Sequence, residues 1–227
     1  MAGAIVSLVL LSGTATWKMF QFRDRLHAFW VNPHWEQRLE QWGMYQDRVI
    51  VFFGDSQLAG WRVGPSFGML PIRNRGISGD QASRAIHRFQ RDVTDEGATL
   101  AVILIGINDL GRETGATPES VAASIDQLVQ RALENEIEIM LCSLLPLQRP
   151  YYSPHRAEQV LAINKWMAER ENVTYIDFHS VLMDEEGRMK TEYTDDGLHP
   201  NERGYAVMTR ILQPHLARHL AKGGGNG

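Results

Sequence analysis

The sequence predicts an α/β protein, a three-layer α/β/α sandwich around a parallel sheet. Short continuous runs of Val, Ile and Leu recur along the chain, and segments with helical periodicity separate them. Runs of this kind are typical of strands buried on both faces, as in a parallel sheet. Their alternation with helices indicates βαβ units. No internal repeat or Pro/Ser-rich linker interrupts residues 48–220, so we expect one domain there.

The apolar runs give the predicted strands in order. They are residues 49–53, a weaker run at 69–74, then 99–105, 137–143 and 173–177. A helix is predicted to begin at Pro118, because Thr117 is a good N-cap and proline suits the first helical position. Two more helices are predicted at residues 155–171 and 202–220, followed by a flexible tail at 221–227.

Composition excludes several classes of protein. Of the 227 residues, 44% are hydrophobic and 22% charged, which is ordinary globular usage and argues against a disordered chain. A formal net charge of −4 gives no reason to expect nucleic-acid binding. The single cysteine, Cys142, excludes an internal disulfide and a multi-cysteine metal cluster.

The N-terminus differs from the rest of the chain. Residues 2–17 carry no charge, a stretch slightly short of the roughly 20 residues that cross a bilayer. The segment 1–22 is therefore interpreted as a short membrane anchor or a cleaved signal peptide, with a soluble packed helix as the third possibility. An anchor or signal would make the protein membrane-associated or place it in the cell envelope. Positive charge after the run, at Lys18, Arg23 and Arg25, favours the cytoplasmic alternative.

Residues 23–47 form an aromatic-rich lead-in. The stripe Trp35, Leu39 and Trp42 follows helical spacing, and we interpret it as the buried face of a helix.

Polar residues follow the predicted strands where they end. Open α/β sheets bind ligands beyond the carboxyl ends of their strands. Ser56 follows the first strand, a turn containing Gly79 follows the second, and Asn108 follows the third. Asp196 and His199 precede the last helix. We therefore expect these residues to gather on one rim of the sheet.

This set contains the groups that acyl transfer requires. A serine hydroxyl such as Ser56 becomes a nucleophile when a base removes its proton, and His199 is suited to that task. Asp196 can hold the imidazole tautomer, although it could equally cap the helix that begins near Pro200. The amides of Ser56 and Gly79 and the side chain of Asn108 are candidate oxyanion donors.

At these positions the sequence resembles the SGNH, or GDSL-type, hydrolase family. Its blocks look like residues 51–56, 74–80, 106–109 and 196–199, with Ser56, Gly79, Asn108 and His199 at the family's functional positions. The likeness is greatest to lysophospholipase/thioesterase and platelet-activating-factor acetylhydrolase-like enzymes. One departure is Gln57, where the family signature has leucine. The resemblance implies a flavodoxin-like sheet of five parallel strands in the order 2-1-3-4-5.

The expected function is that of a serine esterase acting on small carboxylic esters or thioesters, of short-acyl or lysolipid type, without cofactor or metal. The alternative is a non-catalytic envelope or carbohydrate-interaction protein that retains the fold. Asp109 is expected to be structural, pairing with an arginine such as Arg75. His215 and His219, one helical turn apart, are expected on a solvated face.

The N-terminal segment gives a first prediction. Deleting residues 1–17 should leave kcat on a soluble acetyl ester nearly unchanged and should move the protein from the membrane fraction to the soluble fraction, because the predicted chemistry lies within 48–220. Fractionation and a thermal melt of the truncated protein measure this. A full-length protein found only in the soluble fraction, with a destabilised truncation, would favour the packed helix instead.

Overall fold

The computed structural model describes residues 48–68, 70–111 and 114–222 of the chain. The predicted segments 1–22 and 23–47 lie outside the described residues, as does most of the predicted tail. No helix within the described part of the chain combines the length and apolarity that a membrane span requires.

Five parallel strands form one sheet in the order β2-β1-β3-β4-β5. The strands are β1 (Val49–Gly54), β2 (Ile72–Gly76), β3 (Ala98–Leu104), β4 (Glu138–Cys142) and β5 (Thr174–Ile176). This confirms the predicted α/β class and the strand order that the family resemblance implied. The weak second strand lies slightly later than predicted, with its first predicted residue outside the described part.

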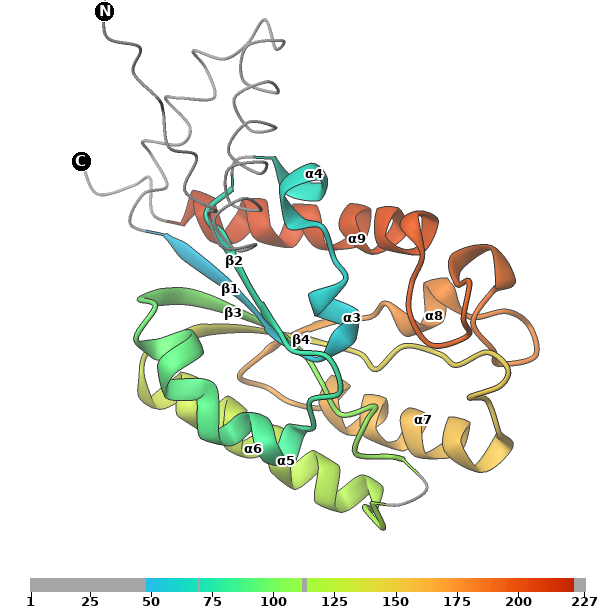
Figure 1. Cartoon of the computed structure of the whole chain (residues 1–227). Helices are drawn as coiled ribbons and strands as arrows, with labels where there is room; N and C mark the ends of the chain where they lie inside the picture. The colour runs from blue at the N-terminus through green and yellow to red at the C-terminus, as the bar shows by residue number, and fades with distance from the viewer. Residues whose placement is uncertain (1–47, 69, 112–113, 223–227) are drawn as a thin grey trace, which may run out of the picture. The chain divides into compact units, whose positions relative to one another are not determined.

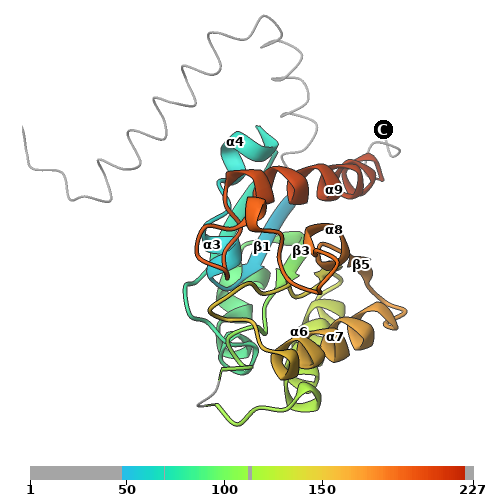
Figure 2. The same cartoon turned by 90° about the vertical axis from the view of Figure 1, so that its right-hand side faces the viewer.

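Helices cover both faces of the sheet (Figures 1 and 2). The longer ones are α6 (Pro118–Glu134), α7 (Pro154–Ala168) and α9 (Glu202–Ala221). The shorter ones are α3 (Ser56–Ala59), α4 (Val63–Phe67), α5 (Ala82–Ala85), η1 (Ile86–Arg88), η2 (Gln90–Thr94), α8 (His179–Leu182) and η3 (Thr191–Tyr193). In both views α6 and α7 lie on one side of the sheet, and α9 and α4 lie on the other.

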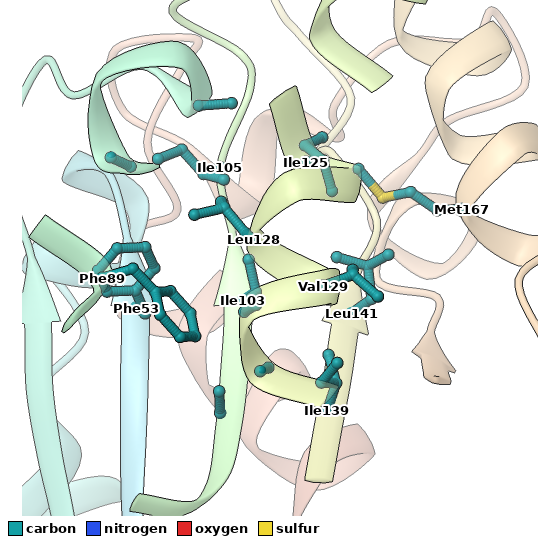
Figure 3. Close-up of a cluster of buried hydrophobic side chains, with 14 of the residues drawn as sticks. Phe53, Phe89, Ile103, Ile105, Ile125, Leu128, Val129, Ile139, Leu141 and Met167 are labelled. Carbon is teal, nitrogen blue, oxygen red and sulfur yellow. The ribbon is translucent and has the colours of Figure 1, made fainter. Parts of the chain in front are cut away.

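Alternate strand residues feed two separate hydrophobic cores. Phe53, Ile103 and Leu141 point to the face covered by α5, α6 and α7, where Phe53 meets Phe89 edge-on at 5.4 Å between ring centroids (Figure 3). The neighbouring strand residues, such as Phe52, point to the face covered by α9. This is the two-residue period of a strand buried on both sides.

Local signals fix the helix starts. Thr117 and Ser120 exchange side-chain and backbone hydrogen bonds in a capping box, and Pro118 occupies the first turn of α6, as predicted. Helix α7 begins one residue before the predicted start, at Pro154, where the Ser153 hydroxyl accepts from the Arg156 amide.

The expectation of a solvated face at His215 and His219 is wrong for His219. Its side chain is buried: Nδ1 lies 2.9 Å from Glu138 Oε2, and Nε2 lies 3.1 Å from Thr99 Oγ1. These contacts connect the end of α9 to the first residues of β3 and β4. The sequence spacing of two histidines gave no information on this, because both partners come from distant strands.

Arg88 holds together the ends of β1 and β2. Its guanidinium, largely buried, donates to the carbonyl oxygens of Gly54 and Arg75, each at 2.9 Å. It also donates to Asp80 at 2.7 Å and to Asp92 at 2.9 Å. A buried charge is tolerated when all its hydrogen bonds are made. Arg88 therefore fixes the edge from which the candidate site residues project.

Asp55 is the buried carboxyl between β1 and α3. One oxygen, Oδ1, accepts from the Gln57 amide at 2.9 Å and caps α3, whereas Oδ2 has no hydrogen-bond partner among the described residues. Burial raises the pKa of Asp55 from 3.8 to about 7; the Gln57 amide opposes this, and the nearby charges of Asp80 and Asp109 add to it. Arg88 partly offsets the rise.

This pKa predicts a pH-dependent loss of stability. Between pH 4 and 7 the unfolded chain has released the Asp55 proton while the folded chain retains it, so the free energy of unfolding falls as pH rises. The stability that the proton on Asp55 contributes is fully present below the unfolded pKa of 3.8 and is lost as the pH rises through about 7. At about 1.4 kcal/mol per pH unit, the loss is on the order of 4 kcal/mol. Asp55→Asn should lack this slope, as measured by urea unfolding at pH 4 to 8. Equal slopes in the two proteins would show that Asp55 is not the titrating group.

Candidate active site

Three polar side chains meet at the carboxyl edge of the sheet. Ser56, the first residue of α3, places its Oγ 2.9 Å from His199 Nε2. The other ring nitrogen of His199, Nδ1, lies 2.6 Å from Asp196 Oδ2. The nucleophile candidate and the base candidate come from positions 143 residues apart. The structure thus brings together the three residues that the sequence put forward as a catalytic set.

Asp196 is held by its own loop. Its Oδ1 accepts from the backbone amides of Leu198 at 2.9 Å and His199 at 2.8 Å. Partial burial would raise the pKa of Asp196, but the hydrogen bonds from the His199 side chain and from these two amides lower it to about 2. Asp196 is therefore ionised at neutral pH and can hold the Nδ1 proton of His199. The cap of α9 is Asn201 instead, which settles the alternative that Asp196 caps this helix.

Gly197 allows the loop to pack against the segment after β4. Its φ is +87°, and a Cβ there would lie 2.3 Å from the Arg149 carbonyl oxygen. The Gln148 amide donates to the Gly197 carbonyl at 2.8 Å. Two tyrosines follow in this segment and have different surroundings: Tyr151 is 40% exposed, whereas Tyr152 packs against the core.

Candidate oxyanion donors lie on the same edge. The amide of Ser56 heads α3, where a helix leaves its N–H groups without an intrahelical acceptor. Gly79 is exposed, has φ +73°, and nothing lies within 4 Å of the position a Cβ would take. Asn108 Nδ2 donates one hydrogen to the Asp80 carbonyl at 2.8 Å, which orients the amide and leaves its second N–H.

Asp109 has a structural role, but its partner is not Arg75. Its carboxylate accepts from the Ala82 amide at 2.8 Å and from the Ser83 hydroxyl at 3.3 Å, so it caps the start of α5. Arg75 pairs with Glu96. Asp109 does not pair with Arg75 because the backbone amides of Ala82 and Ser83 at the start of α5 bind its carboxylate instead.

The site is open to solvent. The side chains of His199 and Asp196 are 38% and 51% exposed. Among the described residues no group of three or more His, Cys, Asp or Glu side chains is arranged to hold a metal ion.

Two contacts escaped the sequence analysis. Gln57 Nε2 donates to the Leu198 carbonyl at 3.0 Å, and the Tyr205 hydroxyl donates to the Gln57 carbonyl at 2.8 Å. The one available signal was the departure of Gln57 from the leucine of the family signature.

Several known proteins are similar to this chain in sequence or in fold. Residues 52–207 match the GDSL-like lipase/acylhydrolase family. A platelet-activating factor acetylhydrolase IB subunit alpha1 from Pongo abelii is 26% identical over 78% of this chain and 79% of its own length. A GDSL-like lipase from Bacteroides thetaiotaomicron superposes with a TM-score of 0.65 and 27% identity, over 76% of this chain and 89% of that one. An acetylxylan esterase from Xylanibacter ruminicola is 26% identical over 33% of this chain and 15% of its own.

The family match covers more than half of the chain and includes the edge where Ser56 meets His199. It supports an enzyme, rather than the non-catalytic protein considered as the alternative. The chain belongs to the GDSL-like lipase/acylhydrolase family and is a carboxylic ester hydrolase.

Proposed function

We propose that the protein is a serine esterase in which Ser56, His199 and Asp196 form a catalytic triad. The observation that carries the proposal is the continuous relay from Ser56 Oγ through both nitrogens of His199 to Asp196, with links of 2.9 and 2.6 Å. Such a relay requires the Nδ1 proton to face the carboxylate, which leaves Nε2 free to accept the serine proton. The lowered pKa of Asp196 supports that assignment.

The proposed reaction has two halves. Ser56 Oγ attacks the ester carbonyl carbon while His199 Nε2 takes the serine proton. The oxyanion is held by the Ser56 and Gly79 amides and by the remaining Asn108 N–H. His199 then gives its proton to the leaving alkoxide, and the acyl group stays on Ser56. A water molecule attacks this acyl ester, its proton passes to His199 and then to Ser56, and the acid leaves.

Two substrate types are proposed, short-acyl esters and lysolipids, and the half-exposed side chains of His199 and Asp196 favour the short-acyl esters. A nucleophile on an open edge can receive an ester with a large alcohol part but offers little apolar surface to a long acyl chain. Two of the relatives described above, a platelet-activating factor acetylhydrolase subunit and an acetylxylan esterase, are named for acetyl esters, which agrees with a short acyl group. Membrane association through residues 1–22 is also proposed, and truncation at residue 17 tests it.

The triad is tested by Ser56→Ala. Removing the nucleophile should lower kcat on p-nitrophenyl acetate by several orders of magnitude, because the residual activity of a triad mutant is only roughly 10³–10⁴-fold above water. A fluorophosphonate should label Ser56 in the wild type and leave Ser56→Ala unlabelled, as measured by mass spectrometry. A Ser56→Ala protein that retains a tenth of wild-type kcat would refute the mechanism.

Asn108→Ala provides the oxyanion arm of the same test. Its kcat should fall by about 10²–10³-fold with KM nearly unchanged, because the donor acts on charge that exists only in the transition state. A raised KM with unchanged kcat would instead make Asn108 a ground-state binding residue.

Acyl length tests the substrate class. Across p-nitrophenyl esters from acetate to palmitate, kcat/KM should be highest at two to four acyl carbons and fall with each longer chain, because the half-exposed site should offer a longer chain little apolar surface. An optimum at ten carbons or more would contradict the short-acyl proposal while leaving the triad intact.

A further inference from the structure

The residue that follows Ser56 links the two halves of the site. Gln57 is fully buried, and its Nε2 donates to the carbonyl oxygen of Leu198 at 3.0 Å. Leu198 directly precedes His199 and lies 141 residues away from Gln57. The side chain therefore runs from the serine turn to the histidine loop, alongside the Ser56–His199 contact.

This hydrogen bond acts on the peptide group next to the base. The peptide that joins Leu198 to His199 has its carbonyl bound by Gln57 and its N–H bound by Asp196 Oδ1 at 2.8 Å. Both ends of one peptide plane are thus fixed, one from the serine side and one from the acid side. Because the His199 side chain leaves the next Cα, the orientation of this plane sets where Nε2 lies relative to Ser56.

Gln57 is itself anchored by its backbone. Its amide donates to Asp55 Oδ1 at 2.9 Å, and its carbonyl accepts from the Tyr205 hydroxyl at 2.8 Å. The Gln57 side chain therefore projects from a backbone that is bound on one side by Asp55, directly after β1, and on the other by Tyr205 of α9. A rigid origin is what a positioning bond requires.

Stability does not account for an amide at this position. Gln57 Oε1 is buried and has no hydrogen-bond partner among the residues described, a state that costs about 1–3 kcal/mol. A leucine, the signature residue of the family that the sequence resembles, would avoid that cost but has no N–H to offer Leu198. The hydrogen bond of Nε2 to Leu198 is therefore the feature of this amide that a functional role would use.

We propose that Gln57 is a positioning residue, whose hydrogen bond to the Leu198 carbonyl holds His199 in register with Ser56. The proposal rests on the proposed triad. The side chain of Gln57 would then link the residues next to Ser56 directly to the loop that carries His199, a link that a leucine at this position could not make.

Gln57→Met tests the proposal, because methionine has a similar length and flexibility but no N–H donor. We expect kcat on p-nitrophenyl acetate, per active site titrated with fluorophosphonate, to fall about 10- to 100-fold, the range that a small displacement of a catalytic group can cause. KM should stay within about twofold, since no group that binds the ester is removed. The Tm should change little, because the unpaired amide oxygen is removed along with the bond.

Gln57→Leu is the second variant and keeps the test valid if the methionine protein folds poorly. Thr209→Val is the matched control. It removes two other hydrogen bonds, that of Trp61 Nε1 to Thr209 Oγ1 at 3.2 Å and that of Thr209 Oγ1 to the Tyr205 carbonyl at 2.7 Å. Neither bond involves the side chain of Gln57 or residues 196–199. This control should lower Tm and leave kcat per titrated site unchanged.

The outcomes separate the two proposals. Wild-type kcat in both Gln57 variants, with Ser56→Ala inactive, overturns the positioning role alone. A rise in KM at unchanged kcat also overturns it, because Gln57 would then act in substrate binding. An active Ser56→Ala protein overturns the triad, and the role of Gln57 falls with it. The positioning role is supported if kcat falls at unchanged KM and Tm in both Gln57 variants and does not fall in Thr209→Val.

Discussion

The buried guanidinium of Arg88 is the contact on which the carboxyl edge of the sheet depends. It binds the Gly54 carbonyl at the end of β1, the Arg75 carbonyl one residue before the end of β2, and the side chain of Asp80. The Asp80 carbonyl in turn accepts from Asn108, so the bonds continue to the end of the neighbouring strand β3. A guanidinium offers its N–H groups in one rigid plane. Three strand ends are therefore held in a fixed geometry by one side chain and the residue it binds.

Ser56 and His199 use this edge differently. Ser56 is the first residue of the short helix α3, which closely follows the central strand β1, and its position follows from the packing of β1. His199 lies on a loop that precedes α9, where its own amide donates to Asp196 and the carbonyl of the preceding residue, Leu198, accepts from Gln57. Sites built on strands and helices are more exact than sites built on loops. These hydrogen bonds are accordingly concentrated on the loop that carries His199, which has no strand or helix to fix its backbone.

The fold could be predicted from the sequence, and the residues of the candidate site could be proposed together, for a physical reason. Strands buried on both faces need continuous apolar runs, and residues at strand ends must gather at one edge, so Ser56, Gly79, Asn108 and the Asp196–His199 pair could be proposed together. The edge strand β2 was harder to locate, because its sequence, Ile-Arg-Asn-Arg-Gly, pairs on one side only and carries little apolar signal.

The partners of Arg88, Gln57 and His219 could not have been predicted in this way. Arg88 binds the Gly54 carbonyl from 34 positions away, and Gln57 binds a carbonyl 141 positions away. Backbone carbonyls are present at every residue and leave no mark in a sequence. His219 shows the same limit, because its exposure depends on where β3 and β4 begin and not on its spacing from His215.

The separation of Ser56 from His199 has a consequence for how the enzyme is made. A further 143 residues must be synthesised after Ser56 before His199, the proposed base, exists, and α9 must then dock against the sheet before the two side chains meet at 2.9 Å. Contacts so distant in sequence form late in folding. Under the proposed mechanism, a growing or half-folded chain consequently carries a serine that no base activates. The appearance of esterase activity during refolding would then mark the moment when α9 is in place.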